Sequence, residues 1–245
     1  TGNALPLRSG YDPSVPSDWS RPGTGWVGWA TAAQFPRIED PAGGRLWTAN
    51  NRTTSGAWLK LLGDSGYDLG ARAQQIRDDL RARDHFTPAD MLAVQLDDRA
   101  VFLSRWQHLL QTTLAQHPDS QLAELQKLTA NWHDHAAIDS VDYRLVRAFR
   151  QKVIHDVLAP FAARTRKRFK HFEWPIKSEA AVWTLVHQRP QWLLASRYAN
   201  WDALLLHAAH EVVDELGKQP GGLAARTWGK RNTADIHHPL AAFLP

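Results

Sequence analysis

Glycine and proline crowd the first part of this chain, and they limit where helices can form. Both residue types recur every few positions as far as residue 44, and both interrupt regular helices. We therefore predict short strands and loops over residues 1–70. The two strand candidates are residues 26–29 and 45–49, and residues 39–44 between them have the composition of a turn.

From residue 71 onward, apolar side chains recur at the three- and four-residue spacing of an amphipathic helix. The predicted helices cover approximately residues 71–80, 88–96, 101–116, 122–132, 140–170, 178–186 and 202–216. Pro160 is expected to kink or divide the longest of them, and Gly217 to end the last. The predicted fold class is α+β and predominantly α-helical, with a strand-and-loop segment over residues 1–70 and a helical region over residues 71–245.

Composition and charge narrow the classes of function. Hydrophobic residues make up 43% of the chain and charged residues 22%, which is the balance of a globular protein and not of a disordered one. Twelve tryptophans fit both a large core and an apolar ligand pocket. The net charge is only +4, and the one basic run, residues 164–170, suits the C-terminal end of a helix. We therefore expect no nucleic-acid partner.

The chain contains no cysteine, which excludes disulfides, thiolate metal sites and a cysteine nucleophile. A chain without thiols is compatible with an exported protein. No 18-residue apolar run is present, so we expect no membrane span. The first residue is Thr1 and not methionine, and we expect the chain to begin inside a longer precursor.

Few motifs point to chemistry from the residues alone. His207 and Glu211 share a helix face, but their order does not match the HExxH pattern of zinc hydrolases, and we predict no zinc site. No GxSxG elbow, P-loop or GxGxxG motif is present. Asn50 and Asn51 follow a predicted strand, where an asparagine amide can face a developing oxyanion. The same pair is also a common turn, and the residues leave both interpretations open.

Five segments resemble patterns of the penicillin acylase family, in the family's order. The segment from Phe35 to Arg52 resembles P-x-x-x-N-P-x-x-G-x-I-x-x-A-N-N, with Asp40 in place of the usual asparagine. The others are residues 70–76, 86–97, 132–140 and 227–240. Members of this family are N-terminal-nucleophile hydrolases with a four-layer αββα sandwich and added helices. The resemblance implies a fragment of the large subunit, downstream of the nucleophilic serine, which this chain lacks.

The resemblance also implies roles for individual residues. Asn50 falls on the family's oxyanion-hole asparagine, and Arg72 falls on its active-site arginine, which organises the nucleophile region and contacts substrate carboxylates. Many members hold a structural calcium, and the match nominates the carbonyl of Pro13 as a ligand, with Asp64 or Asp68 as a further candidate. No cofactor for catalysis is implied.

Three hypotheses follow for the function. The first is part of an acylase that hydrolyses acyl amides such as penicillin-like β-lactams or acyl-homoserine lactones, located in the periplasm or secreted. Its partners would be the small subunit and the N-terminal part of the large subunit, and this chain alone would be inactive. The second is a non-catalytic helical scaffold derived from that family, and the third is a helical module that binds a partner.

Overall fold

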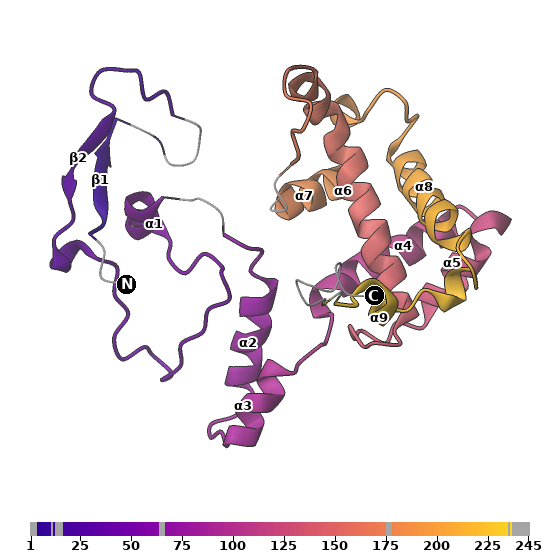
Figure 1. The fold of residues 1–245 in the computed structure, drawn as a ribbon, viewed down its shortest axis with the longest axis horizontal. Helices are drawn as coiled ribbons and strands as arrows, with labels where there is room; N and C mark the ends of the chain where they lie inside the picture. Colours follow the sequence, from indigo (N-terminus) through magenta and orange to yellow (C-terminus); the bar gives the residue numbers. More distant parts are fainter. Residues whose placement is uncertain are drawn as a thin grey trace, which may run out of the picture. The chain divides into compact units, whose positions relative to one another are not determined.

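The computed structural model describes residues 4–10, 12, 17–63, 67–174, 178–234 and 236. These residues form two compact units, Thr1–Gln95 and Leu96–Pro245, which we describe separately (Figure 1). The change in composition at residue 70 therefore precedes the boundary between the units, because two helices that follow it belong to unit 1. The fold class is confirmed: the described chain is predominantly α-helical, with one two-stranded sheet.

Unit 1 contains a short antiparallel hairpin followed by three helices. Strand β1 (Pro6–Ser9) pairs with β2 (Gly25–Trp29), with an irregularity between Leu7 and Arg8. The remaining elements are η1 (Ala32–Gln34), α1 (Gly56–Leu62), α2 (Ala71–Arg81) and α3 (Pro88–Gln95). The α3 start follows from its sequence, since the Thr87 hydroxyl accepts a hydrogen bond from the Asp90 N–H and the Asp90 carboxylate accepts one from the Thr87 N–H.

One of the two predicted strands is confirmed and the other is wrong. Residues 26–29 lie in β2, but residues 45–49 form no strand. A strand requires a hydrogen-bonded neighbour, and β2 finds its neighbour in β1 while residues 45–49 have none in the described chain. The predicted turn before them is confirmed, since the Gly44 N–H donates to the Pro41 carbonyl at 2.8 Å.

Unit 2 is a helical assembly around α6, the long helix at its centre in Figure 1. Its helices of eight residues or more are α4 (Ser104–Gln116), α5 (Ala123–Ala130), α6 (Val141–Arg168), α7 (Glu179–Gln188) and α8 (Trp201–Val212). Its shorter elements are η2 (Val101–Leu103), η3 (Ser120–Leu122), η5 (Gln191–Leu193), the π-helical turn η6 (Val213–Gly217), η7 (Leu223–Ala225) and α9 (Trp228–Arg231). The last long helical segment ends at Gly217 as predicted.

Pro160 does not divide α6, which contradicts one of the two expected outcomes. The helix is continuous from Val141 to Arg168. Proline removes one backbone hydrogen bond from a helix interior, but α6 packs against α4, α5, α7, α8 and α9. This packing stabilises the helix and outweighs the missing bond.

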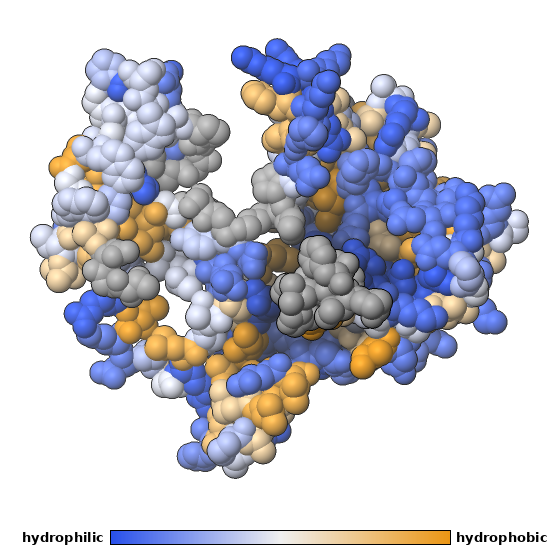
Figure 2. Space-filling model, viewed as in Figure 1, coloured by the Kyte–Doolittle hydropathy of each residue, from blue (hydrophilic) through white to orange (hydrophobic). Residues whose placement is uncertain are grey.

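The two units differ in how much apolar surface they bury. Unit 2 has a continuous core in which Trp106, Phe149 and Leu205 are completely buried. The Trp106 ring meets Phe149 and Trp183 edge to face, at centroid distances of 6.5 and 5.0 Å. In the described part of unit 1, Ala73 alone is buried. Large apolar side chains of unit 1 remain at the surface, including Met91 and Leu92 of α3. Figure 2 shows hydrophobic surface exposed in the region of α3.

Among the described residues, no helix combines the length and the apolar character that a bilayer span needs.

Candidate functional site

Asn50 occupies a tight turn in unit 1 whose backbone conformation suits asparagine. Its φ angle is 60°, in the left-handed region that asparagine tolerates better than most residues other than glycine. The neighbouring Asn51 uses its side chain to hold this turn: Oδ1 accepts from the Ala49 N–H at 3.0 Å, and Nδ2 donates to the Arg52 carbonyl at 2.8 Å. The two asparagines therefore have different roles. The Asn51 amide binds backbone groups of the turn, whereas the Asn50 amide does not.

Arg72 lies in the first turn of α2 and binds the Asn50 turn directly. Its Nη2 is 3.0 Å from Asn50 Oδ1 and 3.1 Å from the Ala49 carbonyl oxygen. With Oδ1 held by the guanidinium, the amide orientation of Asn50 is defined. No described residue accepts a hydrogen bond from Asn50 Nδ2, so that N–H₂ group remains available as a donor.

Asp68 joins the same cluster through both its backbone and its side chain. Its N–H donates to the Asn50 carbonyl at 2.9 Å, and Asn51 and Asp68 form an isolated parallel bridge. Its carboxylate Oδ2 lies 3.0 Å from Arg72 Nη2, one helical turn further along the chain. Residues 50, 68 and 72 are thus connected in one hydrogen-bonded cluster, which we call the Asn50 cluster.

A hollow of about 530 Å³ lies beside the Asn50 turn. Its lining residues come from the loop on both sides of Asn50: Ile38, Pro41, Ala42, Arg45, Leu46, Trp47, Thr48, Asn51, Arg52 and Thr53. The volume is in the range of small-molecule sites. Most of the lining is apolar, and Ile38 and Leu46 are more than half exposed, as expected where another molecule or chain segment covers the surface.

Of the residues expected to hold calcium, only Asp68 is described. Pro13 and Asp64, the other two candidate ligands, lie outside the described residues. The Asp68 carboxylate is in contact with the Arg72 guanidinium, a positive charge at 3.0 Å. Calcium takes six to eight oxygen ligands, and a guanidinium bound to one of them repels the ion. Asp68 as the structure has it does not fit a calcium ion.

Known proteins resemble this chain over nearly its whole length. The family model for penicillin amidase matches residues 1–244. This chain belongs to the penicillin amidase family. It is also 25% identical over 225 residues to the penicillin acylase 2 proenzyme of Pseudomonas sp. (strain SE83), an alignment that covers 90% of this chain and 28% of that relative. The chain thus spans little more than a quarter of the length of this penicillin acylase relative.

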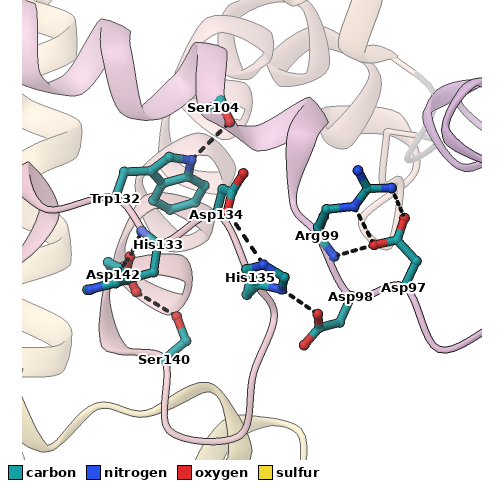
Figure 3. Close-up of polar contacts among 10 residues, drawn as sticks. All are labelled: Asp97, Asp98, Arg99, Ser104, Trp132, His133, Asp134, His135, Ser140 and Asp142. Carbon is teal, nitrogen blue, oxygen red and sulfur yellow. Dashed lines mark hydrogen bonds and ion pairs between the residues drawn. The ribbon is translucent and has the colours of Figure 1, made fainter. Parts of the chain in front are cut away.

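In unit 2, residues 98–104 contact the family-like segment 132–140 (Figure 3). A short antiparallel bridge joins Arg99 to His135, and the His135 Nδ1 lies 2.5 Å from Asp98 Oδ1. That hydrogen bond raises the pKa of His135. Nearby, Trp132 Nε1 donates to the Ser104 hydroxyl at 2.9 Å. These contacts hold residues 98–104 against the 132–140 segment.

Asp142 is the buried acceptor of the same region. Burial alone would raise the pKa of this carboxyl, but hydrogen bonds from the His133 N–H, the Ser140 hydroxyl and the Tyr143 N–H lower it below its ordinary value. The His133 N–H lies 2.8 Å and the Ser140 Oγ 2.6 Å from its oxygens. Asp142 therefore remains ionised and holds residues 133–140 against the start of α6.

A second polar cluster in unit 2 contains the two residues considered above for zinc. Asp156, His207 and Glu211 place ligand atoms within 4.8 Å of one another. Both oxygens of the buried Asp156 are already occupied, by Arg197 Nη2 at 2.8 Å and by the Tyr198 hydroxyl at 2.7 Å. Burial and the bond to Asp156 raise the pKa of Tyr198, which keeps its hydroxyl a donor. This geometry is that of an ion-pair network inside the helical assembly.

The structure brings together the two residues predicted for the site, Asn50 and Arg72, and adds Asp68 to them in a way that sequence reasoning missed. A signal for Asp68 was present, because an acidic residue four positions before an arginine at a helix start favours an ion pair. The catalytic roles of Asn50 and Arg72 stay a prediction.

Proposed function

We propose that this chain is part of an acylase that hydrolyses the amide bond of acylated small molecules. In this proposal Asn50 donates a hydrogen bond to the oxyanion, Arg72 orients Asn50, and the nucleophilic serine comes from a segment outside this chain. The observation that carries the proposal is the contact between Arg72 Nη2 and Asn50 Oδ1, which fixes the amide and leaves Nδ2 available.

The chemistry needs a donor that is in place before the charge develops. When a serine attacks an amide carbonyl, its oxygen becomes negative in the tetrahedral intermediate, and preorganised N–H groups stabilise that charge. A guanidinium bound to Oδ1 polarises the amide and strengthens the N–H₂ group as a donor. Loss of one such donor raises the barrier by about 3–4 kcal/mol.

Arg72 has further donors that suit a substrate. No described residue accepts a hydrogen bond from its Nε or Nη1, and its side chain is 62% exposed. A guanidinium with free N–H groups binds carboxylates and carbonyl oxygens in a fixed plane. We infer that these groups face the substrate, and that the substrate is a penicillin-like β-lactam or an acyl-homoserine lactone. The relative from Pseudomonas is a penicillin acylase 2 proenzyme, which supports the first class.

The partners in this proposal are the remaining segments of the acylase, namely the small subunit and the N-terminal part of the large subunit. Support comes from unit 1, where Trp26, Val27 and Trp29 of β2 are each more than 60% exposed. Exposed aromatic side chains on an open hairpin are typical of a surface that another chain segment covers. We also propose a periplasmic or secreted location, for which the absence of cysteine is the support.

Calcium is not needed for the proposed catalysis. A structural ion held in part by the Pro13 carbonyl stays a prediction, because Pro13 lies outside the described residues.

The test is the Asn50→Gly variant in the intact enzyme assembled with this chain. Glycine accepts the φ of 60° and removes only the amide, whereas alanine would add backbone strain. We expect kcat to fall by about 100- to 1000-fold with KM little changed, because the bond is made in the transition state. A variant with the wild-type kcat would refute the role of Asn50 and favour the alternative of a non-catalytic helical scaffold or partner-binding module.

A further inference from the structure

We infer that Asp68 is a positioning residue that holds the Asn50–Arg72 pair in its working geometry, and that it is not a calcium ligand. This inference rests on the proposed function of Asn50. It concerns a residue to which the family resemblance gave a different candidate role, as a ligand of a structural calcium.

The first support is the backbone contact between Asp68 and Asn50. The Asp68 N–H donates to the Asn50 carbonyl at 2.9 Å, and this is the bond that closes the parallel bridge between residues 51 and 68. Asn50 has a left-handed conformation, which is less favourable for it than ordinary backbone. A hydrogen bond to its carbonyl stabilises that conformation and with it the direction of the Asn50 side chain.

The second support is the competition for Arg72 Nη2. This nitrogen carries two hydrogens but has three acceptors within 3.1 Å, which are Asn50 Oδ1, the Ala49 carbonyl and Asp68 Oδ2. Of the three, only Asp68 is charged, and a carboxylate is the strongest acceptor for a guanidinium. The carboxylate therefore fixes where Nη2 lies, and the position of Nη2 determines where Asn50 Oδ1 is held.

The third support is that the Asp68–Arg72 ion pair contributes little to the stability of the fold. Its side chains are 48% and 62% exposed, and ion pairs this exposed contribute little to stability. The contact is thus poorly explained as a folding interaction, and it leaves the carboxylate beside a cation, where a calcium ion would be repelled. Control of the Arg72 orientation is the function that agrees with both observations.

The experiment uses the intact acylase assembled with this chain and compares four variants: Asp68→Asn, Asn50→Gly, the double variant, and Asp78→Asn. Asp78 is a matched control on α2, because it forms an exposed pair with Arg77 at 2.7 Å outside the Asn50 cluster. For Asp68→Asn we expect kcat to fall by about ten-fold or more, with KM and the melting temperature nearly unchanged. Asp78→Asn should keep the wild-type kcat.

The double variant decides whether Asp68 acts through Asn50. If it does, Asp68→Asn should have no further effect once Asn50 is glycine. Asp68→Glu, which restores the charge, should recover part of the lost kcat. A second readout needs no turnover: in this chain labelled with ¹⁵N, Asp68→Asn should shift the side-chain amide resonance of Asn50, and Asp78→Asn should not.

Three results would overturn the inference. Wild-type kcat in Asp68→Asn, together with a low kcat in Asn50→Gly, would remove Asp68 and leave the proposed function intact. Wild-type kcat in Asn50→Gly would remove the proposed function itself and this inference with it. An Asp68→Asn defect that EDTA reproduces in the wild-type enzyme, with a calcium-dependent loss of melting temperature, would assign Asp68 to a calcium site.

Discussion

Glu179 in unit 2 offers a direct test of how this fold is stabilised, through the substitution Glu179→Gln. The carboxylate is 1% exposed and stands at the start of α7. Its Oε1 accepts from Arg105 Nη2 and Trp106 Nε1, both at 2.7 Å, and its Oε2 accepts from Arg150 Nη2 at 2.6 Å and Nε at 2.8 Å. One buried carboxylate therefore accepts hydrogen bonds from two guanidinium groups and a buried indole.

Glutamine keeps the shape of Glu179 but removes its charge. The amide NH₂ then replaces one of the two carboxylate oxygens and faces the N–H groups of an arginine. At least one donor is left without an acceptor. Arg150 is only 14% exposed, and Arg105 lies between the Phe102 and Trp183 rings at 4.3 Å from each, so neither guanidinium moves readily into water. Removing one partner from such a buried ion pair costs about 3–5 kcal/mol.

The assay is thermal and urea unfolding of this chain, followed by tryptophan fluorescence. A loss of about 3–5 kcal/mol corresponds to a fall of roughly 10 °C in melting temperature for a chain of this size. Asp78→Asn breaks an exposed pair in unit 1 and should change the unfolding free energy of the chain by less than about 1 kcal/mol. If Glu179→Gln were as mild as Asp78→Asn, the reasoning about buried charge would be refuted.

Three further predictions concern activity and pH. If the nucleophilic serine comes from outside this chain, as proposed, the chain alone should not hydrolyse a chromogenic phenylacetyl or long-chain acyl amide, and any turnover above a no-protein blank would contradict this. In the intact enzyme, Asn50→Ala should lower kcat at least as much as Asn50→Gly and should also lower the melting temperature, since alanine is strained at a φ of 60°; equal melting temperatures would show that the strain is absent. The hydrogen bond to Asp98 raises the pKa of His135. The stability that this bond contributes should be complete below the ordinary histidine pKa, and it should disappear as the pH rises through the raised pKa. An NMR titration of His135 in wild type and Asp98→Asn checks this, and an identical midpoint in both proteins would exclude the contact.

Local signals in the sequence predicted the helices after residue 70 well because their causes are local, but they missed α1 (Gly56–Leu62), which lies in the segment predicted to hold only strands and loops. The Thr87–Pro88 start of α3, the apolar spacing in α4 and the end at Gly217 each depend on residues within a few positions of one another. The family resemblance then nominated Asn50 and Arg72, which the structure places in hydrogen-bonding contact. Neither composition nor periodicity could have paired these two residues, because 22 positions separate them.

The contacts that sequence analysis missed join residues that are far apart in the chain. Glu179 has the pattern of an exposed acid in the first turn of a helix, yet its partner Arg105 is 74 positions away. Asp156 and His207 meet across 51 positions, for the same reason. The error at residues 45–49 has a related cause, since β-structure depends on neighbours that a pattern of residues does not reveal.

The two units bury different amounts of apolar surface, and this difference should determine where proteases cut the chain. Digestion begins where backbone opens most easily, and the ease of opening follows local burial. Unit 1 buries little more than Ala73 in its described part, whereas unit 2 encloses a full set of aromatic and aliphatic side chains. Trypsin should therefore degrade the first hundred residues early and leave a durable fragment that starts near Leu96.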